Sequence, residues 1–260
     1  MSTPKKVKQL ALINLIGFLI MVAVNVLSVV LPLAGRSQVE ISDSYYNMFV
    51  PAGFTFSIWS VIYLALIVFI FHSFSKQKVR AFAQIVQDIG SLFLISCLIN
   101  VAWIFAWHYL QIELAMLLMI GLLTSILMIY LRIEKSEIRN GSFEDLTMRL
   151  PFRMYAGWIS VATIANMAAL LTDYQWNGFG IEPQIWVIIM TSIAALIGLF
   201  MLFRFRDFIF PMVIIWALWG ILKERLNDVG ANDMLVEQGI HVLFAVLVLG
   251  MVIRFFRKGK

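Results

Sequence analysis

The sequence predicts an all-α protein that crosses a membrane as a polytopic bundle of about eight helices. Three observations predict this class: 62% of the 260 residues are hydrophobic, only 13% are charged, and the mean hydropathy is +0.90. A soluble domain is nearer half apolar and a quarter charged, so it could not cover this much apolar side chain. The composition therefore excludes a soluble enzyme, a disordered chain and a disulfide scaffold. We expect the lipid bilayer to be the main partner of the chain.

Eight apolar runs reach or approach the roughly 20 residues that a helix needs to cross a bilayer. The last two runs are the shortest. A re-entrant segment at Phe208–Leu222 and a fused hairpin around Arg204 and Arg206 are therefore the alternatives to eight spans. The runs are Leu10–Leu33, Phe54–Phe71, Ile89–Tyr109, Leu114–Leu131, Met154–Leu171, Ile185–Leu202, Phe208–Leu222 and Ile240–Phe255.

The basic residues test this layout independently, because short cytoplasmic loops collect Lys and Arg. With eight spans, 17 of the 20 basic residues fall on one side, and only Arg36, Lys223 and Arg225 fall on the other. Removing one span would scramble this partition. We therefore expect both termini to be cytoplasmic and the protein to be integral to the membrane. The scattered basic residues form no continuous stripe, so nucleic acid is not an expected partner.

Large aromatic and amide side chains recur at helical spacing in four of the predicted helices. An unpaired amide in hydrocarbon costs several kcal/mol, so these stripes should face the interior of the bundle. Hydrogen-bonded packing between helices is one interpretation, and a pocket for a flat, mostly apolar ligand is the other. The stripes are Asn14, Phe18, Met21 and Asn25; Phe56, Trp59 and Tyr63; Ser96, Asn100, Trp103 and Trp107; and Tyr155, Trp158, Ala162 and Asn166.

No catalytic or metal-binding constellation is visible in the sequence. His72, His108 and His241 lie far apart, and none has a Cys, His or carboxylate at metal-ligand spacing. Phosphate-binding loops, nucleophile elbows and zinc-protease motifs are absent from the sequence. We therefore expect no catalytic residue, no metal and no required cofactor. Glu113 and His108 are the only paired candidates for an enzyme that acts on a lipid or pigment.

Three segments of the striped helices resemble the TspO/MBR family, the tryptophan-rich sensory proteins related to the mitochondrial translocator protein (peripheral benzodiazepine receptor). The segment PAGFTFSIW at 51–59, followed by Tyr63, resembles the start of the family's second helix. The pair Asn100-x-x-Trp103 is similar to its third-helix segment, and the segment 151–166 is similar to its fifth-helix signature. The three motifs occur in the family's order, each on the corresponding predicted helix.

The resemblance covers about residues 10–175, and members of this family usually stop after five helices. It therefore divides the chain into a TspO/MBR-like five-helix core at 10–175 and a three-helix C-terminal membrane extension at 183–256. One departure from the family pattern is Pro51-Ala52, which stands where the family usually has a pair of prolines.

The resemblance implies a receptor or sensor with an intramembrane pocket beneath the first loop for porphyrins and other flat aromatic or sterol-like ligands. A tetrapyrrole is thus an implied ligand, and a bacterial cell membrane is the implied location. Assembly into a homodimer is left open. A secondary transporter is the alternative, motivated by the three extra helices and Lys223. Carried over by motif, Trp59, Asn100 and Trp158 would line the pocket, Tyr63, Trp103, Tyr155 and Asn166 would lie beside it, and Pro51, Gly53 and Phe56 would form the turn motif.

Overall fold

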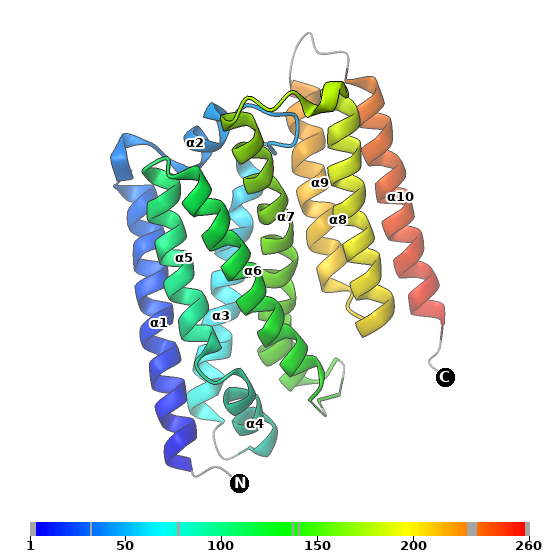
Figure 1. Ribbon diagram of the computed structural model, residues 1–260. Helices are drawn as coiled ribbons and strands as arrows, with labels where there is room; N and C mark the ends of the chain where they lie inside the picture. The colour runs from blue at the N-terminus through cyan, green and yellow to red at the C-terminus, as the bar shows by residue number, and fades with distance from the viewer. Residues whose placement is uncertain are drawn as a thin grey trace.

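The computed structural model describes residues 4–31, 33–76, 79–136, 138–139, 141–227 and 233–257, and every regular element within these ranges is helical (Figure 1). Each of the eight predicted apolar runs overlaps one long helix, which confirms the all-α membrane class. The long helices are α1 (Pro4–Val30), α3 (Ile58–Ser75), α5 (Leu92–His108), α6 (Ile112–Glu134), α7 (Leu150–Asp173), α8 (Pro183–Phe205), α9 (Ile209–Asn227) and α10 (Met234–Phe256).

By length and composition, six spans of the described chain could cross a membrane. A seventh results if α4 (Arg80–Ile89) and α5, which are bent by 49° at their break, count as one. The helix α9 is not among them, because Lys223, Glu224 and Arg225 follow directly on its apolar stretch. The corresponding apolar run, Phe208–Leu222, is one of the two shortest in the sequence.

Two short helices fall outside the predicted runs and lie at opposite ends of the bundle (Figure 1). The helix α2 (Gln38–Ser44) begins with a capping box, in which the Ser37 side chain accepts from the N–H of Glu40 and the Glu40 carboxylate accepts from the N–H of Ser37. The hydrogen bond from the Ser37 backbone lowers the pKa of Glu40. The helix α4 is amphipathic and buries Phe82 and Ile85 against the bundle. Both were missed because neither is long enough to span a membrane.

The helices α1, α3, α5, α6 and α7 form one group, and α8, α9 and α10 form a second, in which α9 and α8 contact α7 and α10 packs on their far side (Figure 1). Close approach of α9 to α7 depends on Gly157, where an added Cβ would lie 3.0 Å from the side chain of Val213. The helix α9 also packs on the short turn η2 (Gly53–Ser57) that precedes α3. The three C-terminal helices therefore contact the first five through α9 above all.

Both ends of the described chain lie toward the same end of the bundle (Figure 1). Eight consecutive long helices return the chain to the side where it began, as the charge partition predicts. Three of the seventeen basic residues assigned to this side, Lys78, Lys258 and Lys260, lie outside the described residues. The structure does not decide which side of a membrane this is, so cytoplasmic termini stay a prediction.

A buried ionic network connects three parts of the chain at this end. The Arg153 guanidinium donates to the Glu134 carboxylate at 2.7 Å and lies 3.9 Å from Asp207. Asp207 precedes α9, and its carboxylate accepts from the Tyr130 hydroxyl at 2.9 Å and from the N–H of Phe210 at 3.1 Å. Burial raises the pKa of Asp207, and Arg153 and these hydrogen bonds oppose that shift. The network thus ties α6 and α7 to the start of α9.

Candidate functional site

A cavity of about 50 Å³ lies beneath the loop that joins α1 to α3. Its walls come from α3, α5, α7 and α9, and its roof comes from α2 and the segment between α2 and α3. Four indoles and a row of small aliphatic side chains make the walls mostly apolar. The lining residues are Gln38, Ser42, Asn47, Phe49, Val50, Pro51, Phe56, Trp59, Trp103, Trp107, Trp158, Val161, Ala162, Ala165, Asn166, Ala169, Ala217 and Ile221.

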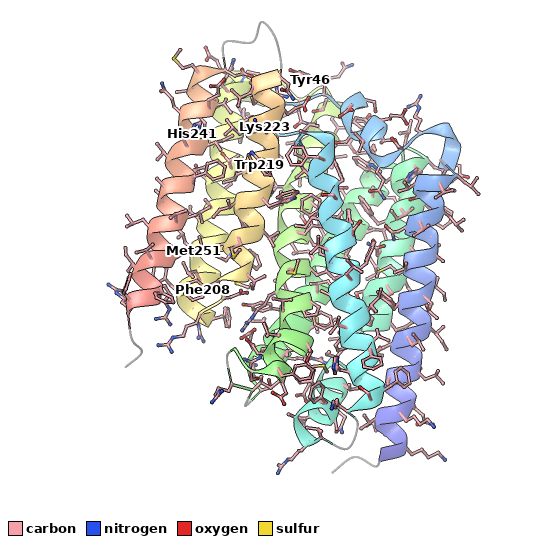
Figure 2. All side chains as sticks on the ribbon, turned by 180° about the vertical axis from the view of Figure 1, so that it is seen from behind. Tyr46, Phe208, Trp219, Lys223, His241 and Met251 are labelled. Carbon is pink, nitrogen blue, oxygen red and sulfur yellow. The ribbon has the colours of Figure 1, made fainter. Side chains whose placement is uncertain are left out.

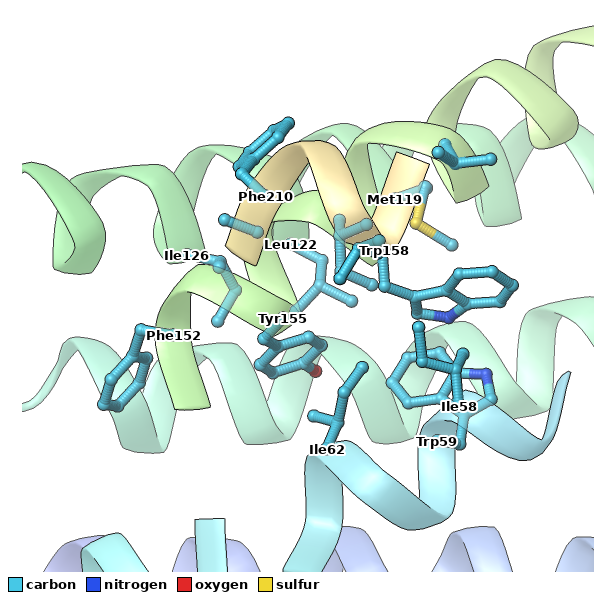
Figure 3. Packing of buried hydrophobic residues seen from close by; sticks show 14 of the residues in the cluster. Ile58, Trp59, Ile62, Met119, Leu122, Ile126, Phe152, Tyr155, Trp158 and Phe210 are labelled. Atoms are coloured by element: carbon cyan, nitrogen blue, oxygen red, sulfur yellow. The ribbon is translucent and has the colours of Figure 1, made fainter. Parts of the chain in front are cut away.

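The aromatic rings around this cavity hold one another in place. Trp59 stacks on Tyr63 with ring centroids 5.6 Å apart, and it meets Tyr155 and Trp158 edge-on at 5.8 and 6.2 Å. Figure 3 shows Trp59, Tyr155 and Trp158 gathered between α3 and α7. On α5, Trp103 and Trp107 stack at 6.0 Å. Such edge-to-face and stacked pairs favour fixed geometry, so the walls present both indole faces and indole edges.

Polar groups at the cavity are few, and most of them have partners. The Asn166 amide oxygen accepts from the indole N–H of Trp103 at 3.1 Å, and its NH₂ group donates to the carbonyl of Ala162 at 2.9 Å. The indole N–H of Trp158 is buried and has no hydrogen-bond partner among the described residues. A buried donor without a partner carries a desolvation cost. Trp158 therefore offers a donor for an acceptor atom at this wall.

Six of the ten residues singled out by the motifs contribute to this one cavity. They come from three separate helices and from the turn before α3. Trp103 and Asn166, expected beside the pocket, belong to the lining itself. The six are Pro51, Phe56, Trp59, Trp103, Trp158 and Asn166.

The other four residues lie outside the lining. Asn100, expected in the wall, is completely buried and accepts from the Asn25 amide at 2.8 Å, while it donates to the Tyr155 hydroxyl at 3.4 Å. Its amide is thus occupied by partners on α1 and α7. Tyr63 and Tyr155 contact Trp59 from outside the lining, and Gly53 is exposed at the turn.

Sequence reasoning missed two parts of the cavity. The roof residues Gln38 and Ser42 belong to α2, whose capping box at Ser37 was the available signal. Ala217 and Ile221 come from α9, in the segment treated as a separate extension. An alanine and an isoleucine in an apolar helix carry no signal of a binding wall, so this contribution was not predictable.

The helix α9 is also fastened to the roof. The N–H of Ala52 donates to the carbonyl of Gly220 at 3.0 Å, and the indole N–H of Trp216 donates to the carbonyl of Thr55 at 3.0 Å. A Cβ at Gly220 would overlap the hydroxyl oxygen of Thr55, so only glycine permits this approach. The Phe54 ring lies edge-on to Trp216 at 5.5 Å. The turn before α3 and α9 therefore form one packed unit.

A second attachment lies one turn further along α9. Arg225 is buried, donates to the Tyr46 hydroxyl at 3.2 Å, and lies over the Tyr46 ring at 5.7 Å. Its guanidinium also pairs with the buried Asp233 at 3.8 Å. Figure 2 shows Tyr46 near the end of α9 that carries Lys223. The segment between α2 and α3 is thus held from the α9 side through a buried charge.

The residues that motivated transport and catalysis lie away from the cavity. Lys223 is exposed on α9 and is not a lining residue (Figure 2). Glu113 accepts from the Tyr174 hydroxyl at 2.6 Å, whereas His108 is buried with its ring nitrogen 2.8 Å from the carbonyl of Ile104. Glu113 and His108 therefore have separate partners. The described residues contain no group of three His, Cys, Asp or Glu side chains that could hold a metal.

Comparison with known proteins agrees with the motif resemblance and extends it. A family model described as TSPO-like protein matches residues 11–253, a range that includes α8, α9 and most of α10. No curated protein and no solved structure matches the chain. The family match covers well over half of the sequence and contains all three motifs. The chain is an integral membrane protein that belongs to the TSPO-like protein family.

Proposed function

We propose that this protein is a membrane receptor or sensor that binds a flat aromatic ligand of the tetrapyrrole class, or a similar aromatic or sterol-like molecule, in the cavity beneath the first loop. The observation that carries the proposal is the buried, unpartnered indole N–H of Trp158 at a wall where four indoles meet. A free donor in an aromatic wall fits a ring system that has an acceptor atom at its edge.

The lining determines which part of a ligand it can hold. Indole faces of Trp59 and Trp103 suit stacking on a planar ring, and Asn166 and the Trp158 N–H supply polar contacts. None of the lining residues is Lys, Arg, His, Asp or Glu. The cavity therefore favours the uncharged body of a ligand, and any carboxylates of that ligand would have to point out toward the roof.

The cavity is narrow in this conformation. A volume of about 50 Å³ holds only a few water molecules, since one water needs roughly 10–15 Å³ on this measure. A macrocycle can enter only if the roof moves and the indoles separate. The roof is attached to α9 through Ala52 and Tyr46, so the proposal requires these attachments to flex when a ligand binds.

The test is an absorbance titration of protoporphyrin IX with the detergent-solubilised protein, with tryptophan-fluorescence quenching as a second readout. Replacing Trp158→Phe keeps a ring but removes the donor, and we expect affinity to fall roughly threefold to tenfold. The matched control is Trp186→Phe, because that indole N–H already donates to the carbonyl of Gly178 at 2.9 Å outside the lining. Unchanged affinity in a Trp59→Ala/Trp158→Ala double variant would remove both residues from the site.

Transport is the second candidate, and one observation favours it: Ala217 and Ile221 of α9 form part of the cavity wall. A path between two helix groups could open if α9 moved relative to α7. Saturable uptake of the same porphyrin into proteoliposomes, reduced by Ala217→Leu, would support transport. Binding of the porphyrin without any flux would contradict it and leave the receptor function.

A further inference from the structure

We propose that a surface hollow between α4 and the end of α6 binds the phosphate-bearing headgroup of an anionic phospholipid. The hollow measures about 910 Å³ and lies at the end of the bundle where α1 begins and α10 ends (Figure 1). It does not share a residue with the cavity beneath the first loop. The polar residues of its lining that are discussed below are Arg80, Gln84, Asp88, Arg132, Lys135 and Ser136.

The charges of the hollow favour an anion. Among the described residues of the lining, Arg80 from α4 and Arg132 and Lys135 from the end of α6 bring three positive charges to one volume, against the one carboxylate of Asp88. That carboxylate already accepts from the amide of Gln84 at 2.8 Å. Basic residues are expected throughout this side for reasons of topology. What distinguishes the hollow is that cations from two helices converge on one space.

One of these cations is held in position by the backbone. The Arg132 guanidinium donates to the carbonyl oxygen of Asp88 at 2.9 Å, and this contact crosses from α6 to α4. Arginine has five N–H donors, and this bond uses one of them. A planar guanidinium fixed at one corner suits bidentate binding of a phosphate. Ser136 lines the hollow beside it, but its hydroxyl already donates to the carbonyl of Ile133 at 2.6 Å.

The surface next to the hollow explains why the anion should be a lipid. Met128 and Leu131 lie four residues before Arg132 and Lys135 on α6, so each pair shares a face of the helix. Both apolar side chains are about two-fifths exposed, Met128 at 41% and Leu131 at 43%. A cationic hollow followed by an exposed apolar turn fits a phospholipid, whose phosphate sits in the hollow while its acyl chains run along α6. A free phosphate would contact only the cationic hollow and would gain nothing from the exposed apolar turn.

The experiment measures lipid binding to the full-length protein by native mass spectrometry. Phosphatidylglycerol and phosphatidylcholine with the same acyl chains are the two probes. We expect the protein to prefer phosphatidylglycerol, and Arg80→Gln/Arg132→Gln/Lys135→Gln to lose that preference by tenfold or more, because each basic residue near an anionic lipid strengthens binding by roughly fivefold. The matched control is Lys5→Gln/Lys6→Gln/Lys8→Gln, which removes the same charge from exposed residues of α1 outside the hollow.

Each outcome decides the proposal. Equal losses in the two triple variants would show general attraction to the charged surface and would overturn the site. Displacement of phosphatidylglycerol by millimolar inorganic phosphate or glycerol phosphate would show a small-anion site and would overturn the lipid assignment. If the triple variant does not fold, Lys135→Gln replaces it. Lys135 is exposed at the end of α6, and an unchanged lipid preference in that variant would also contradict the proposal.

Discussion

The backbone N–H of Ala52 donates a hydrogen bond to the carbonyl oxygen of Gly220 at 3.0 Å, and this contact joins the turn before α3 to α9. The Trp216 indole and Thr55 carbonyl reinforce it on one side, and Arg225 and Tyr46 on the other. The three C-terminal helices are therefore connected to the roof of the cavity. A substitution in α9 should therefore alter the candidate site, even though most residues of α9 do not line the cavity.

Replacing Gly220→Ala should loosen this contact. The new methyl group would overlap the Thr55 hydroxyl and lie 2.8 Å from the Thr55 methyl, so α9 would have to move away from the turn. We expect a loss of about 1–3 kcal/mol in the free energy of unfolding, the usual cost of overpacking. Thermal unfolding of the protein in detergent measures it. The second change Thr55→Ala should restore part of the loss, because it removes the two closest atoms.

Gly121→Ala is the matched control for that variant. Gly121 is also inside a long helix, but a Cβ there would meet the Ile99 side chain at an ordinary 3.7 Å. Alanine is the better helix former, so this variant should be neutral or slightly more stable. Equal melting temperatures for the two alanine variants would contradict the close approach of α9 to Thr55.

Removing the buried cation Arg225 should be more costly than removing both members of its ion pair. Arg225→Met leaves Asp233 buried without its counter-charge, and breaking a buried pair in this way costs about 3–5 kcal/mol. In Arg225→Met/Asp233→Asn neither member of this pair is charged, so we expect a smaller loss than in the single variant. Urea or thermal unfolding of both variants and of Asp233→Asn completes the cycle. Additive losses would show that the pair contributes nothing to folding.

Asn100→Ala should affect stability more than ligand binding. Asn100 accepts from Asn25 of α1 and donates to Tyr155 of α7, and it is not a lining residue. Hydrogen bonds between membrane helices average about 0.6 kcal/mol and reach about 1.7 kcal/mol, so a loss in this range is expected. Porphyrin affinity should change less than in Trp158→Phe. The reverse order of effects would place Asn100 at the ligand, as the family resemblance implies.

The raised pKa of Asp207 should be visible in the pH dependence of the protein's stability. Burial raises its pKa above the ordinary value of 3.8, so the folded protein keeps a proton that the unfolded chain has already released. Its contribution to stability therefore falls as the pH rises from 3.8 through the folded-state pKa. The difference in melting temperature between the wild type and Asp207→Asn should decrease over that range and then stay constant. Glu182→Gln is the control, because it removes an exposed carboxylate. The difference in melting temperature between the wild type and this variant should not change with pH in this way.

The residues that sequence reasoning placed correctly share one property: they had to be buried somewhere. Both Trp59, in the first turn of α3, and Trp158, well inside α7, fall within predicted apolar runs, where a large polar-edged ring should face the bundle interior. Both do line the cavity. Asn100 follows the same rule, but its amide found a partner in Asn25, and no spacing within one helix could identify that partner. The position of a polar or aromatic side chain within an apolar run thus predicts that it is buried, but not which residue of another helix it contacts.

The apolar runs and the distribution of Lys and Arg were enough to determine the helical class, the eight long helices and their alternation between two sides. The reason is that a bilayer leaves a backbone few choices and sorts basic loops by side. Only the tertiary structure decided that α9 completes the cavity and that α4 folds back under α6. These arrangements depend on close contacts such as Gly220 with Thr55 and Arg132 with Asp88. The same residue types would serve equally well against other helices, so their meeting is a property of the packed bundle.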